Sequence, residues 1–315
     1  MFRRNADCEE QLWRLFQAEW CSAMCLLRSL NLNLNLNYMK RWPRATLSEG
    51  ASIILPTMPR SLESTSALLC GGTAGIGLAT ARALASAGVP RIMLVGRSRE
   101  RGEAAVKSVS AAAASADVRF TAADVTTPNG ATRAVAATIE DFGTIDLLVN
   151  TGGGTGLPEL CFKTPIETLT QGMDGLLRGV LLPCRAALPH MMEQKSGTII
   201  NVASDAGKLA TPGEAVIGAG MAGVMMFSRA LALEASRNGI RVNCLTPSIV
   251  RGTPFYDELM VHPFASKIFA KAEKAASLGV VDADELAQLA VFLASPAAAK
   301  ISGQCISMNG GISFA

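Results

Sequence analysis

The residues with the clearest chemical meaning form a glycine run, Gly71-x-x-x-Gly75-Ile76-Gly77, between a short apolar segment and an alanine-rich one. Gly71 permits a tight turn, while Gly75 and Gly77 leave room for a pyrophosphate and for close helix packing. A helix that begins directly after such a turn offers free N–H groups to phosphates. Because strand, turn and helix occur in the required order, the spacing predicts a dinucleotide site.

One position bears on the choice between NAD(H) and NADP(H). Sites for NAD usually place an acidic side chain about 20 residues beyond the glycines, where it binds the ribose hydroxyls. Here that position holds Arg97, and no acidic residue stands beside it. A guanidinium pairs well with a 2′-phosphate, so we expect NADP(H) to be favoured over NAD(H). In the alternative interpretation, Arg97 is a solvated loop residue.

The elements that must position these residues begin at Ser66, where short apolar runs start to alternate with longer alanine-rich segments at helical spacing. Apolar strands separated by helices are typical of a parallel sheet covered on both faces. We therefore expect an α/β doubly wound Rossmann fold with a seven-stranded, mostly parallel sheet and helices on both faces. Leu78–Ala87 is the first predicted helix, with Gly88 as its C-cap. The predicted strands are Ala67–Cys70, Arg91–Val95, Val118–Ala122, Ile145–Val149, Thr198–Val202, Arg241–Leu245 and Cys305–Met308.

Residues 1–62 differ from the rest of the chain. They contain all three tryptophans, an alternating Asn/Leu run over residues 31–37, and eight Lys/Arg against five acidic residues. We interpret this segment as an N-terminal extension that is either poorly ordered or the product of an upstream start codon, with Met58 as the natural beginning. Residues 63–315 are expected to form one domain.

Composition excludes several classes of protein. The body beyond residue 62 carries 21 basic and 21 acidic residues, which argues against a nucleic-acid groove. No run reaches the roughly 18 uninterrupted apolar residues of a membrane span, and acidic residues near the start argue against a targeting signal. The eight cysteines form no C-x-x-C pair and only two histidines are present, so we expect no metal site and reduced thiols in a cytoplasmic protein.

The glycine run resembles the signature of the short-chain dehydrogenase/reductase family, and further motifs follow in the family's order over residues 65–313. Asp124-Val125 matches a pair that contacts adenine. A motif that supports the sheet beside the cofactor is matched by Asn150-Thr151-Gly152-Gly153. A second motif, whose backbone contacts the nicotinamide carboxamide, is matched by Pro247-Ser248-Ile249-Val250. The cofactor-binding positions implied by the resemblance and by the Arg97 argument are Gly71, Thr73, Gly75, Ile76, Gly77, Arg97, Ser98, Asp124, Val125, Asn150, Gly152, Pro247 and Val250.

The resemblance implies an NAD(P)-dependent oxidoreductase acting on a hydrophobic carbonyl or alcohol, like a 3-oxoacyl or ketone reductase. In such enzymes a serine positions the carbonyl, a tyrosine protonates the alkoxide, and a lysine lowers the tyrosine's pKa. Ser204 matches the serine, but the Tyr-x-x-x-Lys pair falls on Ile217 and Met221, and a helical asparagine falls on Leu176. Ile217 can neither give nor take a proton, so the sequence predicts a non-standard proton donor.

Asp205, next to Ser204, is our candidate for this acid, because an apolar pocket would raise its pKa. Lys208 lies beside it, and Tyr256 stands in the segment Thr253–Leu278, which usually forms a substrate lid. In the alternative interpretation, Asp205 and Lys208 belong to a polar loop beside the cleft and Tyr256 only packs. His190 is expected to be structural.

Three functions remain open from the residues. The first is an NADP-dependent reductase with an unusual proton donor and a hydrophobic substrate. The second is a cofactor-binding enzyme with non-redox chemistry, and the third is a non-catalytic nucleotide-binding or partner subunit. The resemblance also implies a homodimer or homotetramer, assembled through long helices around Leu176–Met192 and Gly218–Asn238.

Overall fold

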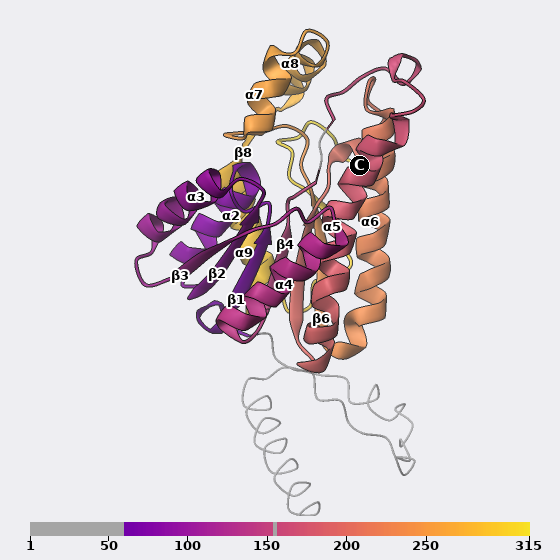
Figure 1. Ribbon diagram of the computed structural model, residues 1–315. Coiled ribbons are helices and arrows are strands. Elements are labelled where there is room, and N and C mark those ends of the chain that lie inside the picture. Colours follow the sequence, from indigo (N-terminus) through magenta and orange to yellow (C-terminus); the bar gives the residue numbers. More distant parts are fainter. Residues whose placement is uncertain (1–59, 154–155) are drawn as a thin grey trace, which may run out of the picture. The chain divides into compact units, whose positions relative to one another are not determined.

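The central sheet has the strand order β3-β2-β1-β4-β5-β6-β9, and every neighbouring pair is parallel. The sheet is therefore wholly parallel where the sequence predicted a mostly parallel one. This computed structural model describes residues 60–153 and 156–315 (Figure 1). The strands are β1 (Ser66–Cys70), β2 (Arg91–Gly96), β3 (Asp117–Ala122), β4 (Leu147–Asn150), β5 (Gly197–Val202), β6 (Ile240–Thr246) and β9 (Cys305–Ser307).

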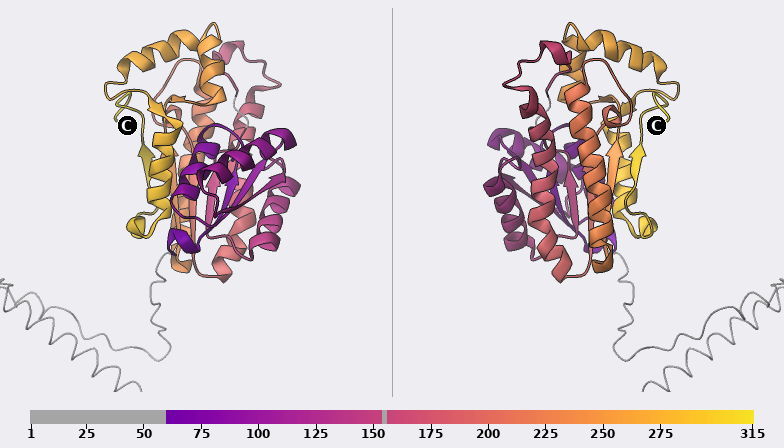
Figure 2. Two further views of the ribbon diagram at one scale, coloured as in Figure 1. Left: turned by 90° about the vertical axis from the view of Figure 1, so that its left-hand side faces the viewer. Right: turned by 90° about the vertical axis from the view of Figure 1, so that its right-hand side faces the viewer.

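Helices cover both faces of the sheet, as the two side views show (Figure 2). Alternate residues of β1 point to opposite faces, so Leu68 packs against α4, α5 and α6, whereas Leu69 packs against α2, α3 and α9. All residues of β1 are buried, which explains its continuously apolar sequence. The helices are α2 (Gly75–Ser86), α3 (Arg99–Ala112), α4 (Pro128–Phe142), α5 (Leu169–Glu193), α6 (Ala215–Ala235) and α9 (Ala283–Ala294).

The strand order reverses at β1, which lies between β2 and β4. In doubly wound sheets, ligands bind outside the carboxyl ends of the strands at such a switch point. Gly71 follows β1 directly, and Thr151 follows β4. The topology therefore places the glycine run where a ligand site is expected.

Two of the predicted boundaries that were wrong have clear local reasons. Helix α2 begins at Gly75 rather than Leu78, because Ala74 is extended and the chain turns into the helix immediately after it. Strand β4 begins at Leu147 rather than Ile145, because the Asp146 carboxylate accepts the Ser66 N–H at 2.9 Å and pairs with Arg60. Gly88 lies just past α2 with a φ of +92°, as its predicted role at the helix end requires.

A smaller layer stands over the carboxyl ends of the strands (Figure 1). It contains a two-stranded sheet, β7 (Val250–Arg251) with β8 (Val281–Asp282), and the helices α7 (Pro254–Val261) and α8 (Ala265–Ala275). Its own apolar cluster includes Ile249, Leu259 and Phe269. This layer corresponds to the predicted lid segment Thr253–Leu278.

Among the described residues, one helix, Ala215–Asn238, has the length and composition to cross a membrane. It comprises α6 and the short helix that follows, and its Val224, Leu231 and Ala235 side chains pack into the core against the sheet. A core helix passes the same test of length and composition. The packing therefore accounts for its apolar sequence.

The described residues belong to a single compact unit. The predicted extension over residues 1–62 lies outside the described residues except for its last three positions, and Met58 lies outside them as well.

Candidate active site

The glycine turn is packed too closely to hold side chains. A Cβ at Gly77 would stand 2.3 Å from the Gly71 carbonyl oxygen, and a Cβ at Gly71 would stand 2.7 Å from the Gly152 nitrogen. Gly71 and Gly75 also have φ values of +84° and +50°, which side-chain-bearing residues rarely adopt. The turn can therefore bring its backbone directly against a ligand.

Helix α2 leaves its N-terminus available to an anion. Ala74 precedes the helix and provides no side-chain cap, and the first turn contains no acidic residue. The unpaired N–H groups and the positive end of the helix dipole therefore face the cavity at Gly75–Gly77. Thr253 closes the other side, since a Cβ at Gly75 would lie 3.3 Å from the Thr253 side chain. These features fit a pyrophosphate.

Two guanidinium groups line one end of this cavity. Arg97 follows β2, and Arg101 lies in the first turn of α3, whose N-cap Ser98 accepts the Arg101 N–H at 3.3 Å. Both side chains are exposed. The sequence reasoning missed Arg101, although its position one turn after Arg97, behind a serine N-cap, was a usable signal.

The remaining predicted cofactor positions divide into two groups. The cavity is lined by Gly71, Gly75, Ile76, Gly77, Arg97, Gly152, Pro247 and Val250. The side chains of Thr73, Ser98, Asp124, Val125 and Asn150 lie outside that lining.

Those five positions support the site from behind or beside it. The Asn150 amide donates to the Asn201 side chain at 2.9 Å and so joins β4 to β5, and Val125 packs against Gly152. The Asp124 carboxylate accepts both the N–H and the hydroxyl of Thr126, and with the nearby Arg97 charge these bonds lower its pKa. Direct contact of these positions with a cofactor stays a prediction.

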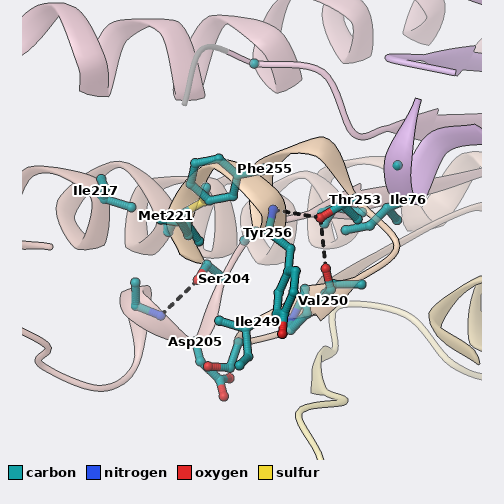
Figure 3. A pocket seen from close by; sticks show the side chains of 18 of the residues that line it. Ile76, Ser204, Asp205, Ile217, Met221, Ile249, Val250, Thr253, Phe255 and Tyr256 are labelled. Carbon is teal, nitrogen blue, oxygen red and sulfur yellow. Dashed lines mark hydrogen bonds between the residues drawn. The ribbon is translucent and has the colours of Figure 1, made fainter. Parts of the chain in front are cut away.

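The opposite end of the cavity has a mostly apolar wall. Ile217 and Met221 project from α6 (Figure 3). Leu176 of α5 also lines the cavity. The two helices pack tightly there, because a Cβ at Gly220 would lie 3.2 Å from the Leu176 side chain. Ser204 follows the end of β5 and accepts the Ala206 N–H at 3.2 Å, a bond that does not use the serine's own proton.

Asp205 is buried and tied to the C-terminal segment. Its carboxylate accepts hydrogen bonds from the Ser307 hydroxyl at 3.2 Å, the Ser313 hydroxyl at 2.9 Å and the Asn309 amide. In Figure 3 the carboxylate points away from Ile217 and Met221. Through these hydrogen bonds Asp205 anchors the C-terminal segment. Its predicted role as an acid stays a prediction.

Lys208 is likewise occupied. Its ammonium donates to the Cys305 carbonyl oxygen at 3.0 Å and to the Ser307 hydroxyl at 2.8 Å. It therefore ties the segment after β5 to β9 and does not line the cavity. This position fits the alternative interpretation, in which Lys208 belongs to a polar loop beside the cleft.

Tyr256 lines the cavity, but its hydroxyl donates to the Glu273 carboxylate at 2.5 Å. This hydrogen bond raises the pKa of the phenol, and the nearby Arg251 opposes the shift. A raised pKa makes Tyr256 a weaker acid at neutral pH. The packing interpretation of Tyr256 is therefore the better fit.

The sequence reasoning also missed Glu214. This residue stands at the start of α6, one turn before Ile217, and lines the cavity half-buried. Burial raises the pKa of its carboxyl, and a hydrogen bond from Thr211 partly offsets the effect. Its position three residues before Ile217, just ahead of the helix predicted around Gly218–Asn238, was the available signal.

One cavity of about 690 Å³ joins all these features, from Arg97 past the glycine turn to Ser204 and the apolar wall. It has the volume of a cofactor-and-substrate site. The described residues contain no cluster of three His, Cys, Asp or Glu side chains suited to a metal.

Comparison with known proteins agrees with this geometry. Residues 71–313 match the family model described as enoyl-(acyl carrier protein) reductase. The chain is 31% identical over 252 residues to a 3-oxoacyl-[acyl-carrier-protein] reductase of Chlamydia muridarum, covering 80% of this chain and 98% of the relative. It is 32% identical over 247 residues to the 2-(R)-hydroxypropyl-CoM dehydrogenase of Xanthobacter autotrophicus, covering 78% and 96%.

Solved structures give the same result. Levodione reductase superposes with a TM-score of 0.75 at 30% identity, covering 80% of this chain and 98% of that one. A short-chain type dehydrogenase/reductase from Mycobacterium ulcerans gives a TM-score of 0.73 at 25% identity, covering 80% and 91%. The chain belongs to the short-chain dehydrogenase/reductase family, and it is an oxidoreductase of that nicotinamide-dependent family.

Proposed function

We propose that the protein is an NADPH-dependent reductase of a hydrophobic carbonyl compound, such as a 3-oxoacyl thioester or a ketone. The observation that carries this proposal is the single cavity that runs from Arg97 and the glycine turn to Ser204 and the apolar wall. The relatives named as 3-oxoacyl-[acyl-carrier-protein] reductases support the substrate class.

The residues of the chain divide the work between binding and orientation. When bound, the dinucleotide supplies a hydride to the carbonyl carbon. The α2 N-terminus and the glycine turn would hold the pyrophosphate, and the Pro247–Val250 backbone would hold the nicotinamide amide. The Ser204 hydroxyl donates to the carbonyl oxygen and fixes its position near the hydride donor.

The apolar wall selects the substrate and excludes water. Ile217, Met221 and Leu176 replace polar positions of the family, and Phe255 and Phe269 add aromatic surface from α7 and α8. Burial of an apolar substrate against such side chains contributes about 25 cal/mol for each Å² removed from water. A hydrophobic chain or ring beside the carbonyl is therefore preferred to a charged group.

The preference for NADPH over NADH rests on charge. Arg97 and Arg101 both line the end where the ribose phosphate would lie. A guanidinium forms charge-assisted hydrogen bonds to phosphate oxygens, and neither sequence neighbour of Arg97 is an acidic residue of the kind that binds a free ribose hydroxyl. The 2′-phosphate would thus have two cationic partners.

We also propose a cytoplasmic homodimer or homotetramer. Exposed apolar side chains on α6, including Met226 and Leu233 at 60% and 80% exposure, support an assembly through the long helices. Molar mass by light scattering tests the assembly, and a concentration-independent monomer would contradict it.

The apolar residues at the family's tyrosine and lysine positions favour one alternative, in which the protein binds the dinucleotide but performs other chemistry or none. The test is calorimetric titration with NADPH and NADH, followed by cofactor oxidation against hydrophobic ketones and 3-oxoacyl thioesters. Tight NADPH binding with turnover supports the reductase. Tight binding without turnover supports the alternative.

A further inference from the structure

Glu214 is placed to take part in the reaction. It lines the same cavity as Ser204 and stands one helical turn before Ile217, the position at which relatives of this family carry their acid. The chain before it is folded against the lid, because a Cβ at Gly213 would lie 2.5 Å from the Phe264 ring. Glu214 therefore follows directly on a residue that packs against the lid, and it lines the cavity.

The helix itself does not use the Glu214 side chain. Glu214 is the N-cap of α6, yet its side chain makes no capping hydrogen bond to the first turn, and glutamate is not among the residues favoured at this position. Its partner is the Thr211 hydroxyl, and burial keeps the carboxyl's pKa raised despite that bond. A partly buried carboxyl without a structural task is a usual feature of a functional site.

The other titratable groups around the cavity have other positions or partners. Asp205 is bonded to the C-terminal segment, and Tyr256 is bonded to Glu273. The remaining titratable residues in the cavity lining are exposed: Arg97, Arg101, Glu258 and Lys271. Glu159, whose backbone N–H donates to the Gly213 carbonyl oxygen, is exposed as well.

We infer that Glu214 is the proton donor that replaces the family's tyrosine, an inference that rests on the proposed reductase function. Hydride adds to the carbonyl carbon while the C=O π electrons move to oxygen. The protonated Glu214 carboxyl gives its proton to that oxygen and the alcohol forms. The carboxylate left behind regains a proton from water, so each turnover consumes one proton and one NADPH and yields NADP⁺.

The test compares Glu214→Gln with Glu159→Gln, the same change at an exposed neighbouring carboxylate outside the cavity. General acid catalysis typically contributes about 10²- to 10⁴-fold, so Glu214→Gln should lower kcat by about 100-fold or more. Wild-type kcat should fall as pH rises through the Glu214 pKa, because reduction needs the protonated carboxyl. This high-pH limb of the kcat profile should be absent in Glu214→Gln, and the affinity for NADPH should stay the same.

A second readout is independent of turnover. Burial raises the Glu214 pKa above its unfolded value, so the protonated form stabilises the folded state and this stability is lost as pH rises through the folded pKa. Glu214→Gln removes that loss. Its Tm should exceed that of the wild type at alkaline pH and match it in acid, whereas a structural carboxylate would give a lower Tm.

The inference is overturned if Glu214→Gln keeps the kcat of Glu159→Gln, or if its pH limb stays in place. Should Glu214→Gln fail to fold, Glu214→Asp decides, because an acid one methylene shorter must retain the limb with a lower kcat. A wild-type protein that reduces none of the carbonyl compounds with NADPH would instead refute the proposed function. The two failures are distinguishable. If the proposed function is wrong, the wild type is inactive; if the role of Glu214 is wrong, Glu214→Gln stays active.

Discussion

Asp205→Asn separates an anchoring role of Asp205 from an acid role. The buried carboxylate accepts from Ser307, Asn309 and Ser313, and hydrogen bonds to a charged group contribute about 1.5–3 kcal/mol each. Asparagine can keep the oxygen that accepts from Asn309 and Ser313, but its NH₂ then replaces the oxygen that accepts from Ser307. Losing the Ser307 bond and the charge in the other two should cost about 2–4 kcal/mol.

For a domain of this size, that cost corresponds to a Tm lower by about 5–15 °C. The assay is thermal and urea unfolding, with Asp174→Asn, an exposed aspartate on α5, as the matched control. Below the lowered Tm, the pH dependence of carbonyl reduction should keep its wild-type position. Unchanged stability with loss of the high-pH limb would refute the reasoning and identify Asp205 as the acid.

Three further changes have defined outcomes. Arg97→Ala should weaken NADPH binding by about 10- to 100-fold through loss of charge-assisted hydrogen bonds and leave NADH binding unchanged by calorimetry; an equal loss for both dinucleotides would contradict the phosphate role. Gly77→Ala sets a Cβ 2.3 Å from the Gly71 oxygen and should lower the free energy of unfolding by about 2 kcal/mol or more, measured in urea; unchanged stability would contradict the turn geometry. Thr211→Val removes a bond that lowers the Glu214 pKa, so the alkaline limb of kcat should move to higher pH; a shift to lower pH would contradict the assignment.

The sheet could be predicted from the sequence because burial on both faces leaves a local mark. Strands such as β1, with every residue buried, read as uninterrupted apolar runs. The glycine turn was equally readable, since Gly71 and Gly77 are required by close packing that no other residue permits. The N-terminal boundary of α2 was not, because glycine at Gly75 and Gly77 weakens the helical signal that the anion-binding turn overrides.

The reacting end depends on contacts that sequence spacing does not reveal. Asp205 and Lys208 meet partners in β9 and beyond, about 100 residues away in the chain, and these bonds occupy groups that a local interpretation leaves free. Glu214 becomes significant only when the fold brings it to the wall of the cavity that Ser204 also lines. The apolar replacements Ile217 and Met221 were readable, but the residue that takes over their chemistry was not.

The most direct test of the central claim is titration of the purified protein with NADPH and NADH, followed by NADPH oxidation in the presence of hydrophobic ketones and 3-oxoacyl thioesters. The cavity that joins Arg97 to Ser204 predicts tighter binding of NADPH than of NADH and carbonyl-dependent oxidation of the bound cofactor. NADPH binding without oxidation by any carbonyl compound, or no binding at all, would contradict it.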